Sequence, residues 1–133
     1  MDTYQVGNGT QQINLAVDIN TLGLAASRAI VLDLSSPAPA LTVGVSSNAT
    51  GDIQEKEIGT GDSLKNMRLS ILTKIDLIGD QESNRTESER LTGIYSLNSG
   101  AEGFKMFDKP EKTVAADFSS VVLFQIIDLI PEP

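Results

Sequence analysis

The chain contains 133 residues, of which 40% are hydrophobic and 21% charged, and its formal net charge is −8. This length builds one buried core and is too short for two, so we expect a single domain over residues 1–133. The chain has no His and no Cys. That excludes a Ser-His-Asp triad, a thiol nucleophile, cysteine- or histidine-ligated metals and disulfide bonds. We therefore expect a protein that is not an enzyme.

The charge and the apolar runs also limit the partners. Eighteen acidic residues against ten basic ones would repel a phosphate backbone, so no nucleic-acid partner is expected. The longest apolar runs, such as Val121–Phe124, are far too short to span a membrane. The first residues, Met1–Gln5, have neither the basic nor the apolar stretch of a signal peptide. We expect a soluble, acidic protein whose compartment the sequence leaves open.

In the first half of the chain, apolar and polar residues alternate with a period of two, which predicts β-strands. Gln12–Ile19 and Arg28–Leu34 each place their large apolar residues on one face. Leu41–Ser46 and Asp52–Ile58 are shorter candidates. Because Asp52–Ile58 is polar on both faces, we expect it at the edge of a sheet, where charge discourages pairing with other chains. Between the first two strands, Leu22–Ala29 has room for one helical turn.

The longest alternating segment is Met67–Ile78, which predicts a strand with one buried and one mostly solvated face. The very polar segment Gly79–Arg90 follows it, and we expect a solvated loop that leads into a strand over Ser88–Leu97. Such a loop would present Arg85 and Arg90 to a partner, which makes these two residues candidate interaction residues. A further short strand is expected over Glu102–Phe107, and Thr113–Phe118 has room for one helical turn and no more.

The last predicted strand, Val121–Ile130, differs from the others because it is apolar on both faces. A strand of this kind belongs at the centre of a sandwich or in a contact between subunits. Pro131 ends it, since proline cannot donate a hydrogen bond to a neighbouring strand. No segment predicts a helix of ten residues or more. About eight short strands separated by turn residues predict an all-β protein, a single antiparallel β-sandwich, with a partly open β-barrel as the alternative.

An unusual pattern concerns aspartate. Four predicted strands contain an Asp between two apolar residues, although Asp is depleted from strand interiors. These residues are Asp18, Asp33, Asp76 and Asp128. Strands that run in the same direction would bring such carboxylates to one rim of the sandwich, where they would suit Ca²⁺ and its six to eight oxygen ligands. The competing interpretation is that each Asp lies on the solvent face and discourages aggregation.

Three hypotheses on function follow from these observations. The first is an interaction or assembly module that binds a protein partner or another copy of itself, since the chain lacks catalytic chemistry and carries the doubly apolar segment Val121–Ile130. The second is a sandwich that binds Ca²⁺ or a small ligand at the Asp-bearing strand ends. The third and weakest is a hydrolase that uses two carboxylates, which eighteen acidic residues make compositionally available.

Overall fold

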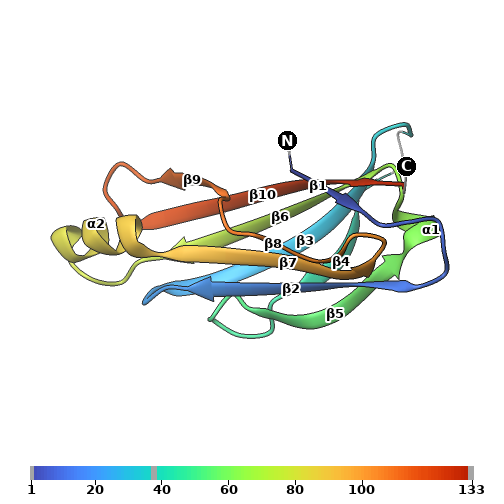
Figure 1. The fold of residues 1–133 in the computed structure, drawn as a ribbon. Coiled ribbons are helices and arrows are strands. Elements are labelled where there is room, and N and C mark those ends of the chain that lie inside the picture. The colour runs from blue at the N-terminus through green and yellow to red at the C-terminus, as the bar shows by residue number, and fades with distance from the viewer. Residues whose placement is uncertain (1, 37–38, 132–133) are drawn as a thin grey trace.

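The computed structural model describes residues 2–36 and 39–131 and arranges the chain as two β-sheets packed face to face (Figure 1). The six-stranded sheet has the order β1 (Asp2–Gln5), β10 (Ser120–Ile130), β6 (Met67–Asp76), β3 (Leu24–Asp33) and β4 (Leu41–Val45), with β9 (Glu111–Val114) also paired to β10. The four-stranded sheet has the order β5 (Ile53–Thr60), β2 (Gln12–Asn20), β7 (Thr92–Gly100) and β8 (Gly103–Phe107). The predicted β-sandwich is confirmed, with no closed barrel and with ten strands among the described residues instead of about eight. It is not purely antiparallel, because β1 pairs with β10 in parallel.

The core lies between the two sheets and follows the period-two alternation. In β6, Leu69, Ile71 and Ile75 point inward and are fully buried. In β2, which crosses them in the other sheet, Ile13 and Leu15 are fully buried as well. Because successive side chains of a strand point to opposite faces, this alternation places one apolar set in the core and leaves the other face for the surface.

Three buried hydroxyl groups, hydrogen-bonded in series, join the two sheets through the core. Thr73 Oγ1 on β6 lies 2.8 Å from Ser27 Oγ on β3 and 3.2 Å from the hydroxyl of Tyr95 on β7. Burial raises the pKa of the Tyr95 hydroxyl, and the hydrogen bond with Thr73 partly opposes that shift. All three residues are buried. Since each hydroxyl has a partner, the series crosses the core without leaving an unsatisfied polar group.

The polar segment after β6 is a helix, so the prediction of a loop there is wrong. The helix α2 (Gln81–Arg90) begins after Asp80, whose carboxylate accepts a hydrogen bond from the Ser83 backbone N–H. It has no apolar face, and so it lacks the 3.6-residue period by which a helix is recognised in a sequence. The only other helix of the described residues is the short α1 (Gly61–Leu64). No helix in the described part of the chain combines the length and the apolar character that crossing a membrane requires.

Other predicted boundaries need correction. The strand expected from Ser88 begins at Thr92, because Ser88 belongs to α2. The single helical turns expected over Leu22–Ala29 and Thr113–Phe118 do not form, since parts of both segments pair in β3 and β9. The short strands β1 and β9 were absent from the sequence interpretation. The expected edge position of the polar strand is confirmed, because β5 forms one edge of the four-stranded sheet.

The strand β10 is an interior strand, paired with β6 on one side and with β1 and β9 on the other. Its inward residues include Leu123 and Ile127, which are fully buried. Its outward residues include Phe124 and Ile126, which are only half-buried. The sandwich therefore uses one apolar face of this strand for its core, and the second apolar face lies at the surface.

Two glycines with left-handed backbone conformations give a matched test of the packing. Gly51 has φ +77° and an added Cβ would lie 2.7 Å from the Cβ of Ala25, whereas Gly103 has φ +76° and an added Cβ would meet nothing within 4 Å. We expect Gly51→Ala to cost about 3 kcal/mol, and Gly103→Ala about 1 kcal/mol from backbone strain alone. Urea denaturation of both variants measures the two free energies of unfolding. Equal decreases in the two variants would contradict this expectation, because they would show that Ala25 moves away from the added Cβ without a cost in stability.

Candidate interaction surface

The outward side chains of β3, β6, β10 and the short β9 form what we call the outer face of the six-stranded sheet. Its central apolar residues are Ile30, Leu32, Leu72, Val122, Phe124 and Ile126. Of these, Leu72 is 47% exposed and the others are half-buried. The four-stranded sheet is different, since the outward residues of its central strands include Asn14, Asp18, Ser96 and Asn98. The four-stranded sheet also has outward apolar residues, namely Ile94 on β7 and the exposed Phe104 and Met106 on its edge strand β8.

The outer face is hollowed at its centre. A hollow of about 260 Å³ is lined by residues of β3, β6 and β10, namely Arg28, Ile30, Leu32, Ser70, Leu72 and Phe124. Its floor forms where the small Ser70 stands directly between Ile30 and Ile126 in the strand register. Because the neighbours of this serine are large and apolar, they rise around it. The result is a depression that an apolar side chain of another molecule would fill.

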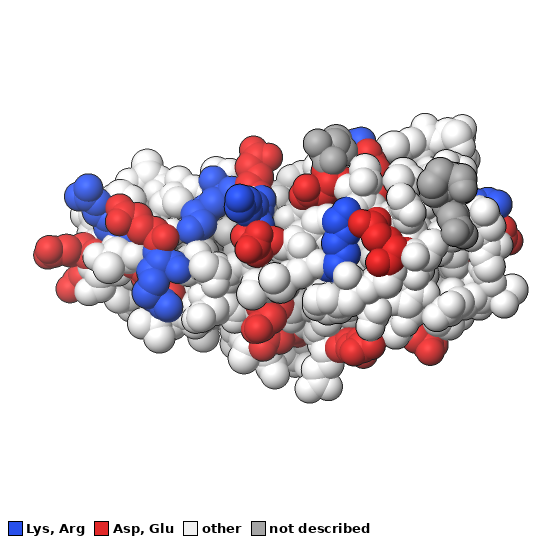
Figure 2. Space-filling view, viewed as in Figure 1, with Lys and Arg blue, Asp and Glu red and all other residues white. Residues whose placement is uncertain are grey.

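Charged side chains surround the apolar centre. Arg68 and Asp128 form a bidentate ion pair, with Nε to Oδ1 at 2.8 Å, and the hydrogen bond to Asp128 raises the pKa of the Arg68 guanidinium. In contrast, Arg28 and Glu111 have neither an ion pair nor a side-chain hydrogen bond within the described residues. Elsewhere on the molecule, Figure 2 shows Asp and Glu side chains along the edge near β5.

The structure does not bring the four candidate calcium ligands together at one rim of the sandwich. Asp18 lies on the four-stranded sheet. Asp76 pairs with Ser120 at one end of the six-stranded sheet, whereas Asp128 and Asp33 lie at the other end. There Asp128 is held by Arg68, and a hydrogen bond from Ser35 lowers the pKa of Asp33. Among the described residues, no three acidic side chains are grouped to hold a metal ion.

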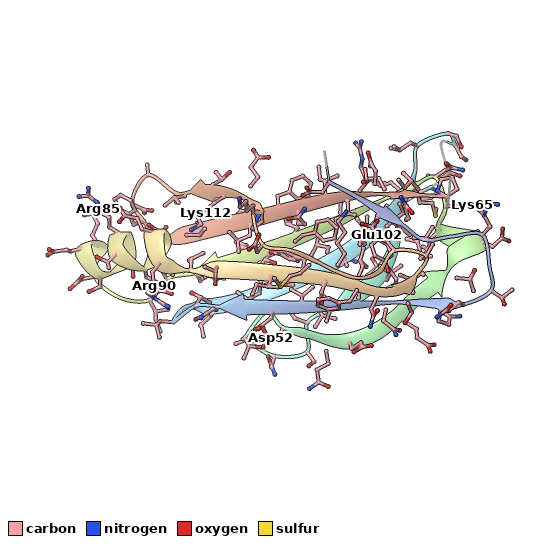
Figure 3. The ribbon with its side chains drawn as sticks, viewed as in Figure 1. Asp52, Lys65, Arg85, Arg90, Glu102 and Lys112 are labelled. Carbon is pink, nitrogen blue, oxygen red and sulfur yellow. The ribbon has the colours of Figure 1, made fainter. Side chains whose placement is uncertain are left out.

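The two candidate interaction residues of the polar segment lie on α2, at different places (Figure 3). Arg85 projects from the outer end of the helix and lies 3.9 Å from Glu89 in an exposed pair. Arg90 forms two hydrogen bonds with Glu87, at 2.8 and 2.9 Å. Because Glu87 is buried against the turn between β2 and β3, Arg90 is part of the contact that fixes α2 to the sandwich. Arg85 remains available at the surface.

A second recess lies where β1 and β9 leave a gap along the edge of β10. It has a volume of about 220 Å³ and is lined by residues that include Asp2, Lys109 and Gln125. The Gln125 side chain donates to Asp2 at 2.7 Å, but its carbonyl oxygen is the one buried side-chain polar atom of the described residues without a hydrogen-bond partner. A buried amide oxygen without a hydrogen bond lowers the stability of the fold.

Comparison of the chain with protein-family models, with curated proteins and with solved structures found no match.

Proposed function

We propose that the protein is a non-enzymatic interaction module that binds another protein surface through the outer face of its six-stranded sheet. The observation that carries this proposal is the solvent-exposed apolar centre of that face, with Leu72 at 47% exposure beside Phe124 and Ile126. A contiguous apolar patch with polar and charged residues around it is typical of a protein-binding surface. The composition agrees with this role, since a chain without His or Cys lacks the usual catalytic groups.

The contrast between the two sheets strengthens the argument. In a sandwich without a partner, an antiparallel sheet ordinarily buries one face in the core and exposes a polar face to solvent. The central strands β2 and β7 of the four-stranded sheet follow this rule at most positions, with Asp18 and Ser96 among their outward residues. The six-stranded sheet departs from it on β3 and β10, which place Ile30 and Leu32, and Phe124 and Ile126, outward on either side of β6. On β6 itself, Leu72 is the apolar outward residue between Ser70 and Lys74. Burial of those residues against a partner would gain about 25 cal/mol for each Å² removed from water.

Photo-crosslinking tests the proposal in cells that express the chain. A photoreactive amino acid at Leu72 samples the outer face, and the same amino acid at Asp18 samples an exposed position on the other sheet. We expect irradiation to give a discrete protein adduct from position 72 and none from position 18. Equal adduct formation at both positions, or no adduct from position 72, would contradict the proposal.

A further inference from the structure

We propose that the partner of the outer face is a second copy of this chain, packed face to face about a two-fold axis that runs parallel to β6 and β10 and midway between them. This inference rests on the proposed function, because it uses the same surface. The identity of the partner and the position of the two-fold axis both follow from how the charges of the outer face are placed.

The outer face differs from the rest of the surface in its charge balance. Self-association of a chain with a net charge of −8 meets electrostatic repulsion over most of its surface. The strands of the outer face are balanced, because their outward cations and anions are equal in number: Arg28, Arg68 and Lys74 against Asp76, Glu111 and Asp128. The recess beside Phe124 and Ile126 adds one charge of each sign, Lys109 and Asp2. The excess negative charge lies elsewhere on the molecule. Two copies therefore meet no net repulsion at this face, whereas their other surfaces repel one another.

The order of residues across the strands is also self-complementary. The register places Arg28, Leu72, Phe124 and Glu111 side by side on β3, β6, β10 and β9. This row reads cation, apolar, apolar, anion. A two-fold axis midway between β6 and β10 reverses the row in the partner. Arg28 then lies over Glu111 of the partner subunit, and Leu72 lies over Phe124 of the partner subunit. The two charges that have no partner among the described residues of one chain become a pair in the dimer.

A second row obeys the same symmetry. Arg68 and Asp128 stand side by side on β6 and β10. The same axis places Arg68 over Asp128 of the partner subunit, so that two ion pairs combine into an alternating group of four charges. In both rows, each charge faces an opposite charge of the partner subunit and no like charges face each other. A surface that binds no partner has no reason to show this pattern.

The hollow of the face supplies the fit in shape. Ser70 on β6 stands at the same level as Ile126 on β10. The axis therefore places Ile126 of the partner subunit over Ser70, where the hollow of about 260 Å³ opens. Two sheets packed in this way run within about 30° of each other and about 10 Å apart, as in the interior of a β-sandwich. The contact uses the same patch on both copies, so association stops at the dimer.

The oligomeric state of the purified chain is the first test. In sedimentation equilibrium at roughly 100 µM, above a micromolar dissociation constant, we expect a mass about twice 14.2 kDa. A monomer at this concentration would overturn the inference. The crosslinking experiment then decides the proposed function separately. An adduct from position 72 with a different protein would keep the function and reject self-association, and the absence of any adduct would reject both.

Charge reversal tests the arrangement. Arg28→Glu and Glu111→Arg each place like charges opposite each other twice in the dimer, so either variant alone is expected to raise the dissociation constant about tenfold or more. The two variant chains mixed together restore both pairs, and we expect a heterodimer with nearly the wild-type dissociation constant. The double variant R28E/E111R is expected to regain dimerisation too, since its row is again self-complementary.

Matched controls separate this effect from changes in net charge. Lys56→Glu on β5 and Asp18→Arg on β2 make the same charge changes at exposed positions outside the face, and both are expected to leave the dissociation constant within about twofold. Circular dichroism checks that each variant is folded. A dimer that neither reversal weakens, or a mixture that fails to re-form a dimer, would overturn the two-fold arrangement.

Discussion

Replacing Ile127 with alanine is expected to lower the free energy of unfolding by about 4 kcal/mol. Ile127 is fully buried between the two sheets, and removal of its side chain beyond Cβ loses apolar burial and leaves a cavity in a close-packed core. Its neighbour Ile126 points to the outer face and is half-buried. The same substitution at Ile126 is expected to cost about 1 kcal/mol in the monomer, because water already reaches that side chain.

Both variants change isoleucine to alanine at adjacent positions of β10, so they differ only in how deeply the lost side chain is buried. Denaturation by urea at low protein concentration, where the chain is monomeric, gives both free energies with one method. From the sequence alone, alanine substitution of Phe124 or Ile126 is expected to lower the free energy of unfolding as much as substitution of a core residue, because both faces of the strand are apolar. Equal losses at the two positions would support that interpretation and would contradict the assignment of Ile126 to the surface.

Strand positions could be predicted from the sequence because alternation has a direct physical cause. Gln12–Ile19 and Met67–Ile78 alternate since one face of each strand packs against the other sheet, and the structure places β2 and β6 there. The boundaries were less accurate where a segment's partner lies far along the chain. The strand β1 has four residues and pairs in parallel with Ile127–Ile130. No local pattern of four residues reveals a pairing partner more than a hundred residues away.

The helix α2 was missed for a related reason. Its residues give no apolar face, and helices are usually recognised by that face. Asp80 at its N-terminus and Arg90 in its last turn are a helix-start and a helix-stop signal, and together they could have identified it. Tertiary hydrogen bonds from Thr21 and Leu22 to Glu87 help to fix the helix, and they become visible only when the turn between β2 and β3 is placed against it.

The aspartate pattern has a simpler explanation than a metal site. Asp18, Asp76 and Asp128 point outward, each between two inward-pointing apolar residues. Alternation itself therefore creates the apolar-Asp-apolar triplets. The direction of each strand decides which end of the sandwich an Asp reaches. Because β6 runs antiparallel to β10, Asp76 and Asp128 lie at opposite ends of the sheet. Sequence spacing contains no information on this point.

The outer face could be predicted only in part. The doubly apolar strand Val121–Ile130 indicated a sandwich centre or a subunit contact, and β10 forms one side of the apolar surface, next to β6. The contribution of Ile30 and Leu72 depends on β3 and β6 lying next to β10, in that order. The row from Arg28 to Glu111 needs the register of four strands. Register is a property of pairing, so the self-complementary charge pattern is visible only in the folded chain.

Replacing Glu87 with glutamine is expected to lower the free energy of unfolding by about 2 kcal/mol near pH 7. Glu87 is buried, and its carboxylate accepts hydrogen bonds from Thr21 Oγ1, the Leu22 backbone N–H and Arg90. Hydrogen bonds to a charged group contribute more than neutral ones. Glutamine keeps the shape and one acceptor oxygen, but it turns an amide toward the Arg90 guanidinium and removes the ion pair.

The pH dependence of this loss is specific to the carboxylate. Burial by itself would raise the pKa of Glu87, but the hydrogen bonds from Arg90, Leu22 and Thr21 together hold the pKa below its ordinary value of 4.5. A carboxyl with a lowered pKa in the folded state contributes stability above its unfolded pKa, and that contribution is lost as the pH falls through its folded pKa. The difference between wild type and Glu87→Gln is therefore expected to stay constant from pH 6 to pH 8 and to shrink below about pH 4.5.

Other carboxyls with lowered pKa values, such as Asp80 and Glu102, destabilise both proteins equally in acid, so only the difference between the two proteins reports on Glu87. Glu89→Gln is the matched control, because Glu89 lies on the same helix with its side chain 74% exposed and only a 3.9 Å pair with Arg85. That change is expected to cost less than about 0.5 kcal/mol at any pH. If Glu87→Gln cost no more than Glu89→Gln, the contact with Thr21 and Leu22 would not hold α2 in place. A loss that stayed constant down to pH 3 would show that the charge of Glu87 is irrelevant to it.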